Sequence, residues 1–316
     1  MNRKFLIPTM AAIMLSSANS APAAAQNDAL APAEGPCEME LSVDNSVDWR
    51  GPYGRGYEVF GNDESFETVN ISVRKEGQPC DFFLTATANG AGGQASLEGP
   101  DSRLSFDVLK TTNGPSFLSS DLFGSQLSRI EGKFGSGRGG YSGALFVSIP
   151  TGQFVRGGKF TGQALIRLFR DGVNGPELVS EAPLAILAPV ASVLEVRSDL
   201  FPEGVRETGI DLGDLSVASR RNVDFEISSN ADISLTFQSA NNGKLAHNAG
   251  GPGINYNLML RGEQLDLAGQ PATHQLAYSG NNQSQSVPLE ISVPAPHGLP
   301  AAGQYNDTLT VTFTAE

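Results

Sequence analysis

Positive charge and long apolar runs are both scarce in this sequence of 316 residues. Lys plus Arg number 21 against 34 Asp plus Glu, which gives a formal net charge of −13. A surface this acidic repels phosphate backbones and anionic lipid headgroups, so we expect neither nucleic acid nor a membrane surface as a partner. Beyond the N-terminal region, no apolar run reaches the roughly 18 residues of a membrane-spanning helix.

Histidine is also rare, which limits the catalytic and metal chemistry open to the chain. His247, His274 and His297 fall in predicted loops and lack the H-x-x-x-H spacing of metal ligands. Residues 140–144, Gly-Tyr-Ser-Gly-Ala, approach a nucleophile elbow but end in Ala, so we interpret them as a Gly-rich hairpin. Nothing marks any two acidic residues as a catalytic pair. We therefore expect no catalytic residue, no metal, no cofactor and no enzyme activity.

Glycine and proline are abundant, and the residues between them favour strands. The 36 Gly and 19 Pro break the chain into short segments in which apolar residues alternate with polar ones. This period of two predicts an all-β fold. The alternating segments are 39–43, 69–73, 82–86, 104–108, 145–149, 164–168, 194–196, 223–227, 233–237, 256–260, 289–293 and 309–313. One stretch differs, because Leu118, Leu122, Phe123, Leu127 and Ile130 follow helical spacing and predict a short helix.

The N-terminus has the features of an export signal. Two basic residues precede an apolar run at 5–15 and a small-residue stretch that ends in an A-x-A cleavage motif at 23–25. Residues 1–25 are therefore predicted to be a signal peptide, which places Gln26 at the mature N-terminus. The Pro- and Ala-rich start of the mature chain, at 26–36, is predicted to be disordered.

Cysteine occurs only twice, at Cys37 and Cys80. An exported protein meets an oxidising compartment, which favours a disulfide over free thiols or a metal site. We therefore predict one disulfide between Cys37 and Cys80. On the chain-entropy model, closing a loop of about 44 residues constrains the unfolded chain by roughly 4 kcal/mol.

An internal repeat divides the chain into two halves. Ser-Ile-Pro at 148–150 and Gly-Lys-Phe at 158–160 correspond to Ser-Val-Pro at 292–294 and Gly-Gln-Tyr at 303–305. In both copies, apolar residues follow the aromatic residue at alternating positions. The repeat predicts two β-sandwich domains of similar size.

We place the two domains at 37–181 and 194–316. The apolar segment between them, 182–193, is broken by two prolines. Two interpretations stay open for it: residues 182–188 complete the first domain as a further strand, or the segment is an apolar linker buried between the domains.

Two stretches of the second half resemble a known family of pilus subunits. The ending AGQYNDTLTVTF at 302–313 is similar to the C-terminal strand of the spore coat protein U family, and short segments within 239–265 resemble its mid-domain sequence. That family comprises secreted subunits of archaic, Csu-type chaperone–usher pili. The resemblance covers 194–316 well and 37–170 more loosely. The second copy departs from the family in lacking cysteine, and the first carries an insertion around the predicted helix.

The resemblance implies immunoglobulin-like, pilin-type sandwiches, of which the second lacks its final strand. A hydrophobic groove would then lie beside the last strand, lined by Tyr305, Leu309, Val311 and Phe313. A periplasmic chaperone would fill this groove first, and at the outer-membrane usher the N-terminal strand of an adjacent subunit would replace it. The last apolar residues lie close to Glu316, so we expect no later segment to cover that strand.

Aromatic residues of the first domain are predicted to contact a surface or receptor such as a glycan. The loop after the first strand interleaves Trp49, Tyr53 and Tyr57 with Arg and Gly, a composition suited to stacking on sugar rings or apolar surfaces. Phe117 and Phe123 lie in the insertion and are candidates for the same contact. The alternatives are a structural turn for the loop and a small satellite core for the insertion.

These features together predict a non-enzymatic tip subunit, an adhesin, exported through the periplasm to a cell-surface pilus tip. Residues 26–36 offer only Leu30 among small residues and prolines, which is too little to enter a neighbour's groove. No subunit would then lie beyond this one. The alternative is a free-standing secreted or periplasmic protein, carbohydrate-binding or part of the envelope, with two complete sandwiches.

Overall fold

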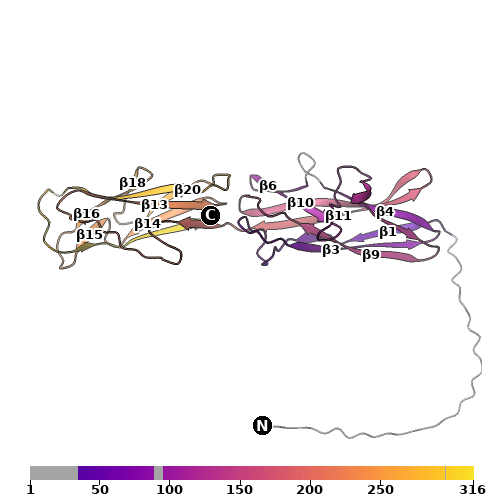
Figure 1. Ribbon diagram of the computed structural model, residues 1–316, viewed down its shortest axis with the longest axis horizontal. Coiled ribbons are helices and arrows are strands. Elements are labelled where there is room, and N and C mark those ends of the chain that lie inside the picture. Colours follow the sequence, from indigo (N-terminus) through magenta and orange to yellow (C-terminus); the bar gives the residue numbers. More distant parts are fainter. Residues whose placement is uncertain (1–34, 89–94, 296) are drawn as a thin grey trace, which may run out of the picture.

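The computed structural model describes residues 35–88, 95–295 and 297–316. Its strands form two elongated lobes that lie end to end (Figure 1), each with its own hydrophobic core. The one helical element in these ranges is a 3-10 turn at Gln126–Ser128, so the predicted all-β fold is confirmed. The described ranges contain no helix of the length and apolarity needed to cross a membrane. The predicted signal peptide and residues 26–34 of the predicted tail lie outside the described residues.

Two sheets pack face to face in the first lobe. One has the order β1 (Glu38–Val43), β3 (Phe66–Glu76), β9 (Gly139–Ser148), β7 (Asp107–Leu109). The other has the order β2 (Ser46–Asp48), β11 (Gly175–Val190), β10 (Gly158–Gly172), β4 (Cys80–Ala88), β8 (Ile130–Phe134), with the hairpin β5 (Ser96–Gly99) and β6 (Ser102–Ser105) beside β10. Alternation turns one face of each strand inward, and Val69, Ile71 and Val73 of β3 are buried there.

A long strand, β11, lies beside β10 in the second of these sheets. The two strands pair antiparallel along nearly their whole lengths, and β2 pairs with the other edge of β11 in parallel. Residues 182–188 lie within β11, and Leu184, Ile186 and Ala188 are buried in the core. The structure therefore matches the first of the two interpretations, in which residues 182–188 form a further strand of the first domain.

The second lobe has a similar two-layer plan. One sheet has the order β12 (Leu194–Arg197), β13 (Ser219–Ser229), β20 (Gln285–Val293), β17 (Asn257–Leu260), β18 (Glu263–Leu265). The other has the order β19 (Ala272–Leu276), β14 (Ile233–Ser239), β22 (Leu309–Ala315), and a small third sheet holds β16 (Ile254–Asn255), β15 (Lys244–His247) and β21 (Tyr305–Asn306). Leu235, Phe237 and Leu258 are fully buried between the two main layers.

The short helix predicted from the spacing of Leu118 to Ile130 is wrong. Ser119 N donates to Ala86 O at 2.9 Å, which ties the start of this stretch to β4. Its only helical part is the single 3-10 turn, capped by the Ser125 side chain. Backbone pairing with the sheet thus replaces the helix that the apolar spacing would equally allow.

A buried asparagine joins the two lobes across the short link between β11 and β12. Asn230 has no exposed surface, and its Nδ2 donates to Ala191 O at 3.0 Å and to Val155 O at 3.2 Å. Its Oδ1 accepts from Val193 N at 2.7 Å, and its main-chain oxygen accepts from Gly157 N at 2.9 Å. One side-chain amide therefore fixes the link to both lobes.

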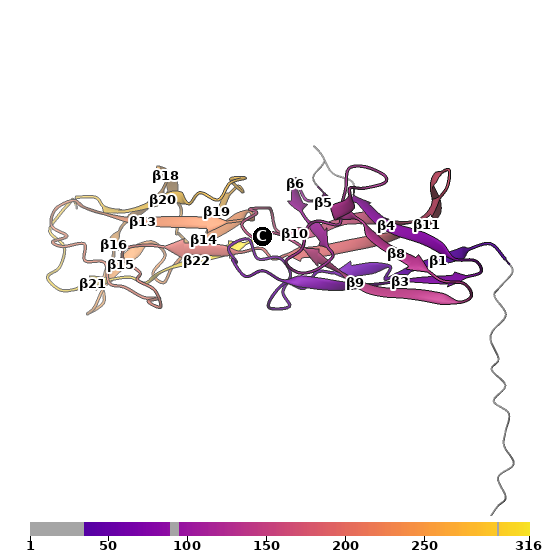
Figure 2. The same ribbon diagram turned by 45° about the vertical axis from the view of Figure 1, so that its right-hand side comes forward.

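An arginine reaches across the same junction. Arg156 of the first lobe pairs with Asp101 at 3.2 Å and with Asp232 of the second lobe, and its guanidinium lies 5.7 Å from the ring centre of Tyr278. The main-chain oxygen of Asp232 also accepts from Glu316 N at 2.9 Å. The end of β22 is thereby tied to the junction, and in Figure 2 the C-terminus lies beside it.

Candidate functional site: an open strand edge and its groove

The two lobes differ at the strand that follows the repeated aromatic residue. In the first lobe this strand, β10, has β4 on one side and β11 on the other. In the second lobe the corresponding strand, β22, pairs with β14, and no strand in the described part of the chain pairs with its other edge. β22 therefore presents unpaired backbone groups where β10 presents none.

Backbone hydrogen bonds at the two ends of β22 show which groups face the open edge. Ala240 N donates to Thr308 O and Glu316 N donates to Asp232 O, both at 2.9 Å. In an antiparallel pair such bonds recur at every second residue, so alternate N–H groups of β22 point to β14 and to the open edge. The N–H groups that point to β14 belong to Thr310, Thr312 and Thr314. Those that point to the open edge belong to Leu309, Val311, Phe313 and Ala315.

The inward side chains of β22 are also less buried than those of β10. The inward side chains of β10 have no exposed surface: Ala164, Ile166 and Leu168. The corresponding side chains of β22 pack against the core but stay partly exposed: Leu309, Val311 and Phe313. Apolar side chains that face a core and still meet solvent indicate that the layer covering them is incomplete.

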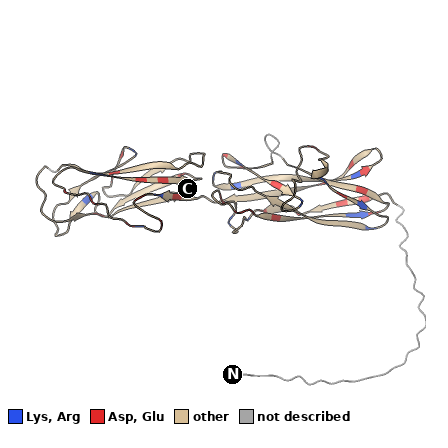
Figure 3. Cartoon of the chain, in the orientation of Figure 1, with Lys and Arg blue, Asp and Glu red and all other residues tan. Residues whose placement is uncertain are grey.

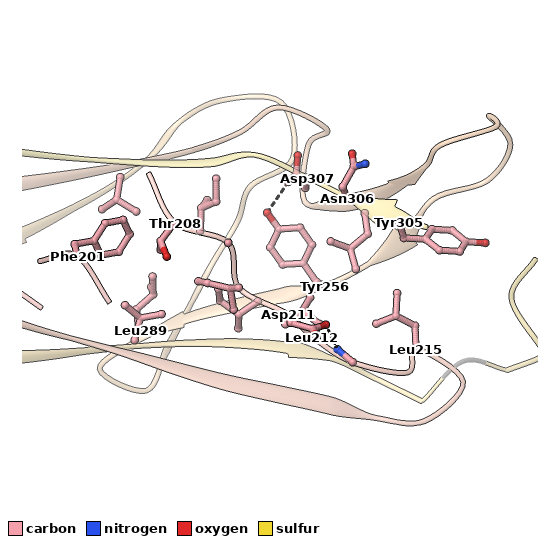
Figure 4. Close-up of a pocket in the computed structure, with 18 of the residues that line it drawn as sticks. Phe201, Thr208, Asp211, Leu212, Leu215, Tyr256, Leu289, Tyr305, Asn306 and Asp307 are labelled. Carbon is pink, nitrogen blue, oxygen red and sulfur yellow. Dashed lines mark hydrogen bonds between the residues drawn. The ribbon is translucent and has the colours of Figure 1, made fainter. Parts of the chain in front are cut away.

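The partly exposed side chains open onto a groove of about 390 Å³ (Figure 4). Of the residues predicted to line a groove, Tyr305, Leu309 and Val311 lie in one of its walls. Phe313 lies further along β22, with its ring edge-on to Phe225 at 5.2 Å between centroids. The floor of the groove is apolar and consists of Val223, Phe225, Leu245, Leu289 and Ile291.

The opposite wall of the groove, residues 208–213, was not predicted from the sequence. β12 pairs only with the last residues of β13, and within residues 35–88, 95–295 and 297–316 no strand pairs with the earlier part of that edge. Residues 208–213 run beside it, held by Arg221 Nε, which donates to Asp211 O at 2.8 Å. Ile210 and Leu212 turn toward the core. Their alternation is the signal that could have identified this wall.

A buried polar network fixes the start of β22. Asp307 Oδ2 accepts from the Tyr256 hydroxyl at 2.7 Å and from the Ser239 hydroxyl at 2.6 Å, while its Oδ1 accepts from Asn241 N at 2.9 Å. Burial, followed by the hydrogen bond to Asp307, raises the pKa of Tyr256 well above its usual range. The network holds the connection between β21 and β22 and so positions Leu309 in the groove wall.

The aromatic residues predicted for surface contact are mostly buried. Trp49, Tyr57 and Phe117 are at most 4% exposed, so the prediction that these three rings form a contact surface is wrong. The reason is that the loop folds back onto the sheet: the N–H groups of Trp49 and Tyr57 donate to carbonyls of β11 at 2.7 and 2.8 Å. Tyr53, at 61%, and Phe123, at 42%, are exposed, and for them surface contact stays a prediction.

The insertion covers a satellite core on the outer face of the sheet. Phe83 and Phe169 stack there at 5.0 Å, and Phe123 meets Phe169 edge-on at 5.4 Å. The Arg129 guanidinium lies 4.4 Å from the ring centre of Phe83. The satellite-core alternative thus describes Phe123 in part, whereas Phe117 belongs to the main core of the first lobe and Leu122 and Leu127 are exposed.

Cys37 and Cys80 form the predicted disulfide, with their Cα atoms 6.2 Å apart. The bond joins the starts of β1 and β4 at the end of the first lobe farthest from the second (Figure 1). Within the described residues, no group of three His, Cys, Asp or Glu could hold a metal ion. Two histidines have structural neighbours: His247 lies 4.8 Å from the Tyr305 ring, and His274 lies 3.7 Å from Glu263.

No family model and no curated protein matches the chain, so membership of the spore coat protein U family stays a prediction. Solved structures of pilus tip adhesins are similar at low identity. The CsuC–CsuE chaperone–tip adhesion subunit complex from Acinetobacter baumannii shares 11% identity over 87% of this chain and 99% of that chain, with a TM-score of 0.40.

Two further structures of pilus adhesins are similar to the chain at comparably low identity. The CupB6 tip adhesin from Pseudomonas aeruginosa shares 10% identity over 90% of this chain and 95% of that chain, with a TM-score of 0.44. CfaE, the adhesive subunit of CFA/I fimbria of enterotoxigenic Escherichia coli, shares 13% identity over 88% and 81% of the two chains, with a TM-score of 0.33. At this level of similarity, the function of the chain has to be argued from its own residues.

Proposed function

We propose that this chain is a non-enzymatic subunit of a chaperone–usher pilus, an adhesin at the fibre tip. Its second lobe accepts a β-strand from another protein along the open edge of β22. The strand comes first from a periplasmic chaperone and then from the adjacent subunit, exchanged at the outer-membrane usher. Its first lobe contacts a surface or receptor at the cell exterior.

The observation that supports this proposal is the contrast between β10 and β22. In the first lobe, β11 pairs with β10 and covers its inward side chains completely. In the second lobe, the equivalent position beside β22 is a groove of about 390 Å³ with an apolar floor. A strand placed there would satisfy the N–H and C=O groups of the open edge and bury the side chains below it, which is the physical basis of strand addition.

The charge of the second lobe bears on the partner. Residues 194–316 carry 14 Asp and Glu against six Lys and Arg. Figure 3 colours the Asp and Glu positions of this lobe red and its Lys and Arg positions blue. An incoming protein with Lys or Arg beside its inserted strand is therefore attracted electrostatically. Its association rate should fall as salt is added, because the charges involved are solvent-exposed.

A tethered strand tests the acceptor edge without any other protein. Residues 182–188 of β11, Ala-Pro-Leu-Ala-Ile-Leu-Ala, are appended after Glu316 through a flexible Gly-Ser linker, so that they turn back along β22 as an antiparallel hairpin. We expect the thermal midpoint of the second lobe to rise by about 5–10 °C, as for a gain of one to two kcal/mol in a domain of this size.

The matched control is the same tether with Ser in place of its leucine and isoleucine residues. This control keeps the backbone and the linker but removes the side chains that fill the groove, so it should leave the midpoint unchanged. A midpoint raised equally by both tethers, or by neither, would contradict the acceptor edge. Either result would favour the free-standing carbohydrate-binding or envelope protein instead.

A further inference from the structure

The loop at residues 49–63 is hydrogen-bonded to β11 and lies at the end of the first lobe nearest the second. Tyr57 forms a β-bridge with Val190, the last residue of β11. Gly56 adopts a φ of +91°, and a Cβ there would lie 2.1 Å from the main-chain oxygen of Pro189. Only glycine permits so close an approach, so the backbone of the loop packs directly against β11.

A cavity of about 20 Å³ lies inside this loop. Trp49, Tyr53, Tyr57 and Asp63 are among its lining residues. Trp49 is 3% exposed, and no atom of the described residues accepts a hydrogen bond from its indole Nε1. The Tyr57 hydroxyl, by contrast, accepts from Gln153 N at 2.8 Å. A buried N–H without an acceptor costs free energy. A cavity of this size holds one oxygen atom, which would supply that acceptor.

Planar and charged groups are exposed around the cavity. The Tyr53 ring is largely exposed, and its hydroxyl is hydrogen-bonded to Asp63 Oδ2. The Arg55 guanidinium lies 5.6 Å from the Tyr53 ring centre and pairs with Glu58 at 2.6 Å. Because Arg55 and Glu58 balance each other, the charge that remains beside the exposed ring is the negative charge of Asp63.

We propose that this loop binds an uncharged pyranose sugar. The Tyr53 ring stacks on the apolar face of the sugar, and the Asp63 carboxylate accepts hydrogen bonds from its hydroxyls. One hydroxyl oxygen of the sugar enters the cavity and accepts a hydrogen bond from Trp49 Nε1. The negative charge of Asp63 repels sugars that carry a carboxylate or sulfate. This inference names the class of receptor for the first lobe and rests on the contact role proposed for it.

Trp49 is the only tryptophan in the chain, so its fluorescence reports directly on this loop. The mature full-length protein is titrated with the methyl glycosides of glucose, galactose and N-acetylglucosamine, and with sialic acid as the anionic comparison. We expect a saturable change in Trp49 emission with at least one neutral sugar. Tyr53→Ser should weaken that binding by about tenfold, the effect of one stacking ring.

Two variants serve as controls for this experiment. Val173→Ser changes a fully exposed apolar residue in the turn between β10 and β11 and should leave the affinity unchanged. Asp63→Asn keeps the shape of the site but removes its negative charge. It should therefore reduce the difference in affinity between the neutral sugars and sialic acid. Thermal midpoints of all variants verify that each is folded.

Three results would each overturn the inference: no saturable change with any neutral sugar, unchanged affinity in folded Tyr53→Ser, or a stronger response to sialic acid than to the neutral sugars. The titration does not involve the groove of the second lobe. The tethered-strand experiment decides the anchoring role separately, so failure of one proposal is distinguishable from failure of the other.

Discussion

A hydroxyl group placed on β22 distinguishes an open strand from a covered one. Val311→Thr replaces a methyl group by a hydroxyl of similar size. In the free chain Val311 is partly exposed in the groove wall, so the hydroxyl reaches water and the unfolding free energy should change by less than about 0.5 kcal/mol. With a strand seated in the groove, the same hydroxyl loses water without gaining a partner, which costs roughly 1–3 kcal/mol. The stabilisation conferred by the strand should fall by that difference.

Urea unfolding of the second lobe measures this difference in four proteins, the free and tethered chains with Val or Thr at position 311. The matched control is Ile166→Thr in β10, where the side chain has no exposed surface and β11 already covers it. That substitution should cost roughly 2–4 kcal/mol in the first lobe with or without the tether. A Val311→Thr penalty as large in the free chain as in the tethered one would refute the reasoning, because it would mean that Val311 is already covered.

Three further predictions concern the junction, the far end of the first lobe and the polar network. Asn230→Ala should lower the unfolding free energy by about 2–3 kcal/mol and broaden the range of interlobe orientations seen by small-angle X-ray scattering. Asn222→Ala, at an exposed position, should change neither, and equal behaviour of the two variants would show that the Asn230 hydrogen bonds do not hold the lobes together. Lys75 is buried and donates to the carbonyls of three glycines in adjacent turns, at 2.6, 2.6 and 3.0 Å. Lys75→Met should therefore speed amide exchange in those turns. Unchanged exchange would show that Lys75 does not stabilise them. Because the pKa of Tyr256 is raised in the folded state, the stability that this group contributes is present below about pH 10 and should be lost as the pH rises toward the folded pKa. Tyr256→Phe should remove this loss. An identical pH profile of stability in the variant would exclude Tyr256 as the source of the loss.

Alternating apolar residues predict the strands because each sheet has one buried face. The same alternation places Lys75 on the inward face of β3, in step with Ile71 and Val73, and the lysine is indeed buried there. The sequence could not show what satisfies its ammonium group, since the accepting carbonyls come from turns at 77 and 135–137. Local periodicity determines which face of the sheet a side chain points to, whereas its hydrogen-bond partners depend on contacts between segments that are distant in the sequence.

Loops were less predictable than strands for the same reason. Composition alone makes Trp49 and Phe117 suitable for a surface, but backbone pairing with β11 and β4 folds both loops inward. The open edge of β22 was expected from the resemblance and the repeat. Its opposite wall at 208–213 was missed because the alternation there is limited to Ile210 and Leu212, which is shorter than the alternating segments that predict the strands.

Amide exchange along β22, measured by NMR, tests the central claim most directly. In the free chain the N–H groups of Thr312 and Thr314 are bonded to β14 and should exchange slowly, whereas those of Val311 and Phe313 face the open edge and should exchange fast. With residues 182–188 tethered after the C-terminus, Val311 and Phe313 should become as protected as their neighbours. Uniform protection in the free chain, or an alternation that the tether leaves unchanged, would contradict the claim that this edge accepts a strand.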